Sequence, residues 1–254
     1  MSWTPDCKPF IRIVRLDVDR LDELMSIQEQ VCAQLEMPEL YFPVTEGEMQ
    51  EFFRTDGICY GAMHESRLVG FFGVLLMRDR PDNVGHDLGL MREELARVVY
   101  FKAVNVLPEY RGLGLQKSLT QAVFKELGVD LPLRSTSGLD AASRVMCATV
   151  SPLNLSSLKS FLECGFWIAG LKPMYEGYQR FLVMRRGKKG SLDLAGTVTV
   201  PVQDYPDQER LLAQGMCGIR LHASLPDAPS IIYIGSEKIA YSGKDGLHEC
   251  IKQR

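Results

Sequence analysis

The sequence lacks an excess of charge of either sign, because 29 basic side chains oppose 32 acidic ones and leave a net charge of −3. Nucleic acid is therefore not expected as a partner, since binding it depends on a basic field that neutralises phosphates. The one basic cluster, Arg185-Arg186-Gly187-Lys188-Lys189, follows an apolar run. We expect this cluster to form a solvated linker rather than a binding patch.

Patterns typical of metal sites and disulfides are also missing. The 7 cysteines are odd in number, scattered and without a C-x-x-C pair, and the 4 histidines are isolated. No metal site is therefore expected. No signal-peptide pattern is recognised either, so we expect reduced thiols and a cytoplasmic location.

No apolar run in the sequence is long enough for a lipid bilayer. The longest, from Leu68 to Met77, has about half of the roughly 20 residues that a membrane-spanning helix needs, and we interpret it as a buried strand. We expect no membrane insertion. Repeats and low-complexity tracts are absent, and 254 residues with 46% apolar content suffice for one large domain, or one with a small appendage.

Hydrophobic periodicity predicts the element order βααβββαβαββ up to residue 185, which indicates an α/β fold around a mixed sheet. Asp17 or Asp19 is a candidate cap for the first helix, and Thr45-Glu46-Gly47-Glu48 is a capping box that begins the second. Glu65-Ser66 joins two strands as a hairpin. Strands are expected at 10–16, 58–64, 67–77, 98–107, 145–150, 166–175 and 179–185, and helices at 21–35, from 45 onward, at 113–127 and at 155–164, with polar connections at 79–95 and 128–143.

The character of the sequence changes beyond Gly187, where elements become short. We place a boundary near 187–195, with one domain at 1–188 and a small β-rich extension at 189–254 whose role stays open. The extension has three candidate roles: it extends the sheet, covers the acceptor side, or makes a dimer contact. Its expected strands are at 196–202, 219–223, 231–234 and 238–241, with a helix at 207–214.

The most informative stretch is 104–116, where a buried strand runs through a proline turn into a glycine-rich loop that begins a helix. Glycines allow close approach of the backbone to a ligand, and a helix start offers free N–H groups to an anion such as pyrophosphate. Arg111 adds a permanent charge suited to phosphate. Simple turn glycines are the alternative. A dinucleotide site would need a third glycine at Lys117, and a nucleotide P-loop would need a glycine before Lys117.

Two motifs resemble the GNAT acetyltransferase superfamily. Pro-Glu-Tyr-Arg-Gly-Leu-Gly-Leu-Gln at 108–116 resembles its pyrophosphate signature, R-x-x-G-x-G/A, with Gln116 where the family usually has Gly or Ala. The stretch 149–166 resembles the second half-site, in which Asn154 and Ser157 contact the pantetheine arm. Taken alone, Asn154 is more readily interpreted as a helix cap. The resemblance covers roughly 10–186.

The resemblance implies a GNAT-like fold and an N-acetyltransferase that moves an acetyl or longer acyl group from acetyl-CoA to an amine of a small molecule or peptide. Backbone amides at Asn105–Val106 would then stabilise the oxyanion. The alternative is a catalytically inactive acyl-CoA-binding regulatory module, and either reading allows a monomer or a homodimer. The implied CoA-binding residues are Asn105, Val106, Arg111, Gly112, Leu113, Gly114, Leu115, Gln116, Asn154 and Ser157.

The sequence departs from the family at both usual catalytic positions, so the catalytic residues stay unknown. Phe161 stands where the family has a tyrosine acid, and Lys102 stands where many relatives have a glutamate base. Substitute candidates are Tyr175, Tyr178 and Lys102 itself, and each also suits a structural role. Further candidates are Tyr100, which shares a strand face with Lys102, the loop residues His86, Asp87 and Glu93, and, for a long acyl chain, the apolar side chains of Phe161, Phe166 and Trp167.

Overall fold

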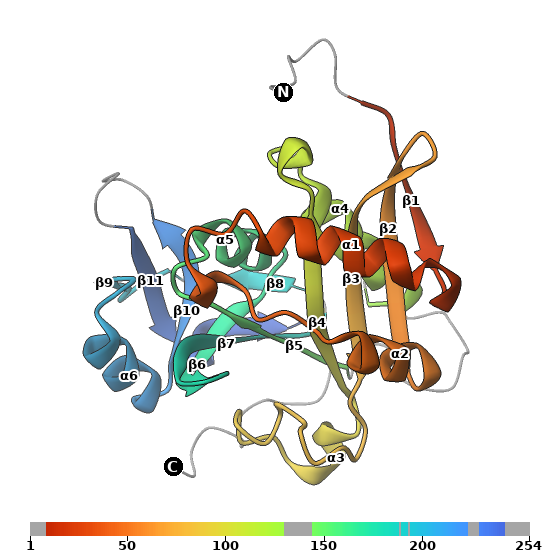
Figure 1. The fold of residues 1–254 in the computed structure, drawn as a ribbon. Coiled ribbons are helices and arrows are strands. Elements are labelled where there is room, and N and C mark those ends of the chain that lie inside the picture. Colours follow the sequence, from red (N-terminus) through yellow and green to blue (C-terminus); the bar gives the residue numbers. More distant parts are fainter. Residues whose placement is uncertain (1–8, 130–143, 188, 193, 223–228, 242–254) are drawn as a thin grey trace.

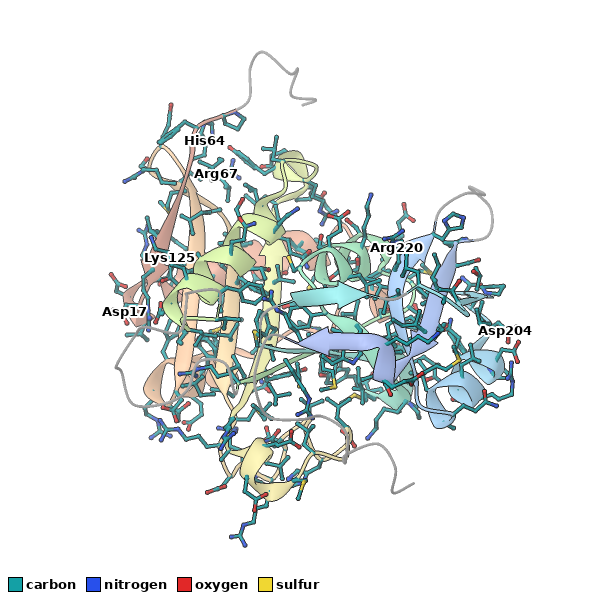
Figure 2. The ribbon with its side chains drawn as sticks, turned by 180° about the vertical axis from the view of Figure 1, so that it is seen from behind. Asp17, His64, Arg67, Lys125, Asp204 and Arg220 are labelled. Carbon is teal, nitrogen blue, oxygen red and sulfur yellow. The ribbon has the colours of Figure 1, made fainter. Side chains whose placement is uncertain are left out.

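The computed structural model describes residues 9–129, 144–187, 189–192, 194–222 and 229–241. Its centre is a ten-stranded sheet in the order β1-β2-β3-β4-β5-β7-β6-β10-β11-β9. In the first half of the chain, α1 and α2 cross one face of this sheet (Figure 1), and α4 lies across the opposite face over β2, β3 and β4 (Figure 2). The mixed α/β sheet predicted from the sequence is confirmed.

The strands of the sheet alternate direction except at one point, where β4 and β5 run parallel. The strands of this sheet are β1 (Ile11–Leu16), β2 (Gly57–His64), β3 (Arg67–Leu76), β4 (Val98–Val106), β5 (Val145–Val150), β6 (Trp167–Met174), β7 (Tyr178–Arg186), β9 (Val198–Pro201), β10 (Met216–His222) and β11 (Ser230–Gly235). Two further strands, β8 (Lys189–Leu192) and β12 (Ile239–Tyr241), pair with each other. The helices are α1 (Leu21–Cys32), α2 (Glu46–Arg54), α3 (Arg92–Leu95), α4 (Leu115–Glu126), α5 (Leu155–Glu163) and α6 (Tyr205–Ala213).

Local signals explain several boundaries. The capping box at α2 is confirmed, because the Thr45 hydroxyl accepts from the Glu48 amide at 3.2 Å and Glu48 Oε2 accepts from the Thr45 amide at 2.9 Å. The hairpin between β2 and β3 is confirmed, with Glu65 in the left-handed region at φ 54°. The predicted cap of α1 is wrong. Asp17 makes no side-chain cap bond and Asp19 lies inside a short 3-10 turn, so this turn leads directly into α1.

The core on the α4 side of the sheet is aromatic. Phe101 of β4 packs with Phe72 of β3 at 5.2 Å and with Phe124 of α4 at 6.2 Å between ring centroids. From α5 and the segment after it, Phe161 and Phe166 lie 6.1 and 5.3 Å from the same ring. Burial of these five rings attaches α4 and α5 to the sheet, since each aromatic side chain contributes a large apolar area.

The expectation of a solvated linker at 185–189 is wrong for its first two arginines, because β7 continues to Arg186. Arg185 is only 4% exposed, its guanidinium lies 4.2 Å from the Phe124 ring centroid, and it donates to the Cys164 carbonyl at 2.8 Å. Arg186 pairs with Glu94. Both arginines therefore belong to the packed structure, which local composition did not indicate.

Of the three roles left open for the residues after 188, the structure shows that β9, β10 and β11 extend the sheet, whereas β8 and β12 pair with each other as a separate two-stranded sheet. β10 pairs with β6 at Gly218↔Ile168, β11 pairs with β10, and β9 forms the edge. A Cβ at Gly218 would lie 2.9 Å from Ile168 Cδ1 and 2.8 Å from Ile231 Cγ2, so the close approach of these strands requires glycine. Asp204 caps α6, which contacts β6 and β10. The division of the chain near 188 stays a prediction.

Candidate acyl-CoA and acceptor site

A split between the two parallel strands lies at the centre of the sheet. The pairing of β4 with β5 ends at Phe101↔Ala148. Beyond that point β4 continues to Val106 beside β3, whereas β5 continues to Val150 beside β7. The two strands therefore diverge toward their C-terminal ends, as Figure 1 shows. At about 3.3 Å per residue, the free edge of β4 from Phe101 to Val106 is roughly 16 Å long.

A bulge lies where the split begins. The register between β3 and β4 runs from Gly73↔Ala103 to Val74↔Phe101, so Lys102 is the extra residue on β4. A bulge bends its strand and increases the local twist. We attribute the divergence of β4 from β5 in part to this bend.

The register also determines which β4 amides face the split. The Leu107 amide donates to the Val69 carbonyl of the segment that leads β3, at 2.9 Å. Because bonding alternates along an antiparallel pair, the amides of Val104 and Val106 turn away from β3 and toward the split. The backbone of Asn105 instead faces β3. Of the two residues expected to contribute an amide, the register orients only Val106 toward a ligand in the split.

The side chain of Asn105 lies on the α1 side of the sheet and is 1% exposed. Its Nδ2 donates to the Tyr41 hydroxyl at 2.9 Å, and that hydroxyl donates to Gln28 Oε1 at 2.8 Å. Asn105 Oδ1 is buried and has no partner among the described residues. A buried acceptor without a donor is uncommon and identifies this position as unusual.

The glycine-rich loop lies at the open end of the split. Gly112 and Gly114 have φ of 78° and 74°, a region that disfavours side chains, and a Cβ at either would meet no atom within 4 Å. The N-terminus of α4 at Leu115 has no side-chain cap, so its first N–H groups lack an intrahelical partner. Arg111 is exposed beside them, whereas Leu115 is buried and Leu113 half-buried. Open space, free amides and a guanidinium fit a pyrophosphate.

The second motif contacts the first. Asn154 caps α5, because its Oδ1 accepts from the Ser157 amide at 3.1 Å, and its Nδ2 donates to the Leu40 carbonyl at 3.4 Å. Gln116 Nε2 lies 3.3 Å from Ser157 Oγ. The residue that departs from the family signature thus connects the N-termini of α4 and α5 on either side of the split.

Three hydroxyl groups meet where the split begins. The Tyr100 hydroxyl lies 2.9 Å from Thr149 Oγ1 and 2.9 Å from the Tyr175 hydroxyl, and the latter two are 3.1 Å apart. Burial, followed by the neighbouring Tyr175, raises the pKa of Tyr100 well above its ordinary value. Phe42, from the segment between α1 and α2, stacks on the Tyr175 ring at 4.8 Å. We call Tyr100, Thr149 and Tyr175 the hydroxyl cluster.

Lys102 is next to this cluster along β4 and forms an ion pair with Glu48 of α2, with Nζ 3.4 Å from Oε1. Its side chain is 24% exposed. Burial alone would raise the pKa of Glu48, but hydrogen bonds from Thr45 and the charge of Lys102 outweigh it and lower that pKa. The pair borders a pocket of about 250 Å³. The pocket is lined by Gly47, Glu48, Glu51, Phe52, Thr55, Leu75, Arg80, Asp82 and Lys102.

The position of the family's tyrosine acid, Phe161, packs against Phe101 on the α4 side of the sheet. Phe161 is 3% exposed and belongs to the aromatic core, as does Phe166 at 2%. Trp167 is 6% exposed. Core packing, the default role given to these rings in the sequence, is what the structure shows.

The connection between β3 and α3 contributes one contact across the sheet. Asp87 pairs with Lys172 of β6 at 2.6 Å, and His86 is exposed. Within the described part of the chain, no group of three or more His, Cys, Asp or Glu side chains is arranged to hold a metal ion. None of the described helices combines the length and the apolar character needed to cross a membrane.

No family model matches the chain, and no curated protein matches it. Solved structures match its fold. NAA60 from Arabidopsis thaliana in complex with acetyl-CoA has a TM-score of 0.53 at 16% identity, covering 70% of this chain and 98% of that one. An acetyltransferase of the GNAT family from Streptococcus pneumoniae has a TM-score of 0.51 at 13% identity, over 70% of this chain and 100% of that one. This chain has the GNAT acetyltransferase fold.

A structure described as a putative phosphinothricin N-acetyltransferase matches the same fold, with a TM-score of 0.51, 17% identity, and coverage of 71% and 100%. The fold expected from the two GNAT-like motifs is thus confirmed. These matches span almost the whole of each GNAT chain and leave the rest of the present chain without a counterpart.

Sequence reasoning missed several residues of the site. Tyr41 and Phe42 lie in a connection that carries no recognisable motif, and Thr149 lies in the second motif outside the positions expected to bind CoA. Arg180 of β7 is buried as well. It follows Gln179 near the start of its strand, and adjacent polar residues are usually exposed, so no local signal distinguishes this arginine.

Proposed function

We propose that this protein is an N-acetyltransferase that transfers the acetyl group of acetyl-CoA to the amine of a small molecule or peptide. The observation that carries the proposal is the split between β4 and β5, with the uncapped, glycine-preceded start of α4 at its open end. This arrangement offers an unpaired strand edge to a thioester arm and an anion site to its diphosphate. The fold shared with GNAT acetyltransferases supports it.

In this proposal, the diphosphate is bound by Arg111 and by the amides that begin α4. The pantetheine arm follows β4, where the amides of Val104 and Val106 turn toward it. Ser157 lies at the start of α5, next to Gln116 of α4. Asn154 contributes by holding the start of α5 in place as its cap. The remaining residues implied by the resemblance contribute through their backbone or by shaping the loop. They are Gly112, Leu113, Gly114, Leu115 and Gln116.

The reaction forms a C–N bond to the acyl carbon and breaks its C–S bond, while one proton leaves the amine and one reaches the sulfur. An amine with a pKa near 10 is neutral in only about one molecule per thousand at pH 7, so a desolvating pocket favours the reactive form. We assign the sulfur's proton to Tyr175 of the hydroxyl cluster, which stands where the split begins. Phe161 has no hydroxyl, and Lys102 is engaged by Glu48.

The first experiment measures binding and turnover separately. We expect acetyl-CoA to bind in titration calorimetry, and thiol release to follow when a broad panel of amines is added. Arg111→Ala should weaken acetyl-CoA binding by about 1.5–3 kcal/mol, as expected for a hydrogen bond to a charged group. Arg67→Ala, which removes an exposed arginine paired with Glu109, is the matched control. Equal effects of the two variants would contradict the assignment of Arg111.

A second candidate function is a CoA-binding regulatory module without catalysis. The aromatic packing of Phe161 and the ion pair of Lys102 favour it, because neither family catalytic group is present. It predicts tight acetyl-CoA binding without thiol release from any amine. Slow but measurable aminolysis that depends on the folded protein would eliminate it.

We also propose a cytoplasmic location, on the ground that the five cysteines the structure describes are all free. Three of them, Cys59, Cys147 and Cys217, are buried, and burial raises the pKa of each thiol to about 12. Buried thiols with raised pKa values resist oxidation. Light scattering distinguishes a monomer from a homodimer, and the proposed reaction is compatible with both.

A further inference from the structure

Arg180 of β7 is a buried cation whose charge is incompletely matched. It is 3% exposed, and its Nη1 donates to the carbonyl of its neighbour Gln179 at 3.0 Å. Its Nη2 is buried without a hydrogen-bond partner among the residues that the structure describes. The negative charge of Glu39 acts to raise the pKa of Arg180. Glu39 nevertheless forms no ion pair with it.

Two aromatic rings stabilise the buried charge of Arg180 only in part. The guanidinium lies 5.4 Å from the centroid of Tyr175 and 5.8 Å from that of Tyr178. Cation–π contacts stabilise a cation, but they leave a hydrogen-bond donor such as Nη2 unsatisfied. Buried charges are usually both paired and hydrogen-bonded, because removal from water penalises them strongly. Burial correspondingly lowers the pKa of Arg180.

The position of Arg180 connects it to the proposed reaction centre. Tyr175, over whose ring its guanidinium lies, belongs to the hydroxyl cluster where the split between β4 and β5 begins. Phe42 covers the same tyrosine and is 43% exposed. Phe42 and the guanidinium of Arg180 therefore both contact the ring of Tyr175, the residue to which the proposed reaction assigns the proton of the sulfur.

We infer that the acceptor is an amine that also carries a carboxylate, of amino-acid or small-peptide size, and that Arg180 binds this carboxylate. The inference rests on the proposed acetyltransferase function. A guanidinium with one unsatisfied nitrogen suits a monoanion, since charged hydrogen bonds from arginine to carboxylate are among the strongest in proteins. The nearby Lys172 is engaged by Asp87, so the region offers no second free cation for a phosphate among the described residues.

The first test compares amines with and without this charge. Glycine, alanine, leucine and phenylalanine are each assayed beside their carboxamides, with thiol release from acetyl-CoA as the measure. Rates are expressed per neutral amine, because the carboxamides have a lower amine pKa. We expect kcat/KM to be roughly 10- to 100-fold higher for the acids, as for a hydrogen bond to a charged group. The comparison uses the unaltered protein, so it does not depend on a variant that folds. Equal rates, or a preference for the amides, would overturn the inference.

The second test locates the recognition. Arg180→Met keeps much of the side-chain volume and removes the charge, and Lys172→Met removes a half-exposed cation that lies opposite Arg180 in the register of β6 and β7. We expect Arg180→Met to abolish the preference for acids by raising their KM, while acetyl-CoA still binds. Lys172→Met should retain the preference for acids. A loss of rate that is equal for acids and amides would indicate a structural role and contradict the inference.

The proposed function can fail separately. If no amine of the panel releases thiol, binding of each acid and amide is measured by thermal shift in the presence of CoA. Stabilisation by the acids alone, lost in Arg180→Met, would support the carboxylate site while rejecting the reaction. Absence of any difference between acids and amides would reject the site.

Discussion

The two faces of β4 differ in chemistry although they belong to the same nine residues. On the α4 side, Phe101 is surrounded by four phenylalanine rings. On the α1 side, Tyr100 meets the hydroxyls of Thr149 and Tyr175. The family's usual acid position, at Phe161, belongs to the first face. A hydroxyl group that could act as the acid is therefore expected on the second face, where the strand order brings three hydroxyls together.

One face of β4 stabilises the fold, and the opposite face carries the hydroxyl groups to which we assign the proposed reaction. The aromatic face holds α4 and α5, and with them both helix starts beside the split, in a fixed position. The polar face contains buried groups whose hydrogen bonds are incomplete, such as Asn105 and Arg180. Local departures from complete pairing are expected where a ligand binds.

The largest effect should come from the aromatic face. Phe101→Ala removes the ring at the centre of the cluster and should lower the free energy of unfolding by about 3–5 kcal/mol. Chemical denaturation monitored by circular dichroism measures it. Phe10→Ala, at an 81% exposed position, is the control and should change stability little. A similar loss in both variants would contradict the picture of a packed aromatic core.

On the polar face, Tyr175→Phe should leave stability nearly unchanged but lower kcat by about 100-fold, the lower end of general acid catalysis. Steady-state kinetics with the best acceptor of the panel measures it. Tyr60→Phe, which removes a hydroxyl that bonds Glu126 far from the split, is the matched control. Unchanged kcat in Tyr175→Phe would remove the tyrosine from the reaction and leave the positioning of the substrates as the source of catalysis.

Introducing the tyrosine that is usual at position 161 in GNAT acetyltransferases should lower stability and leave kcat no higher. Phe161→Tyr adds a hydroxyl to a ring that is 3% exposed and packed against other phenylalanines, so we expect it to destabilise the protein by about 1–3 kcal/mol without increasing kcat. Thermal unfolding and kinetics measure the two effects. A faster enzyme of unchanged stability would show that position 161 reaches the split, and the contrast between the faces would be lost.

The smallest effect concerns the contact between α4 and α5. Gln116→Ala removes the hydrogen bond to Ser157, and we expect a loss of about 0.5–1.5 kcal/mol in stability, the net value of a typical hydrogen bond. Acetyl-CoA affinity, measured by calorimetry, should change by only a few fold, because alanine is also found at this position of the family signature. Ser157→Ala should behave alike. A tenfold loss of affinity in Gln116→Ala would instead show direct contact with the coenzyme.

Much of the fold followed from local patterns. The capping box at Thr45, the hairpin at Glu65-Ser66 and the glycine-rich start of α4 appear at the predicted places. The cap predicted for α1 failed because a 3-10 turn competes with a capped start. The prediction for Arg185 was wrong for a different reason. Its guanidinium contacts a ring of α4 and a carbonyl that follows α5, and no residue near it in the sequence indicates these contacts.

The amino-acid sequence by itself determined the backbone conformations that depend on a few adjacent residues, including the left-handed glycines of the loop at 112–114. It also determined the order of strands and helices through their periodicity. Only the tertiary structure decided which polar groups meet. Tyr100 and Tyr175 are 75 positions apart, and burial distinguishes Arg180 from the exposed Arg111. Such contacts depend on packing between distant segments, and local propensity carries no information about it.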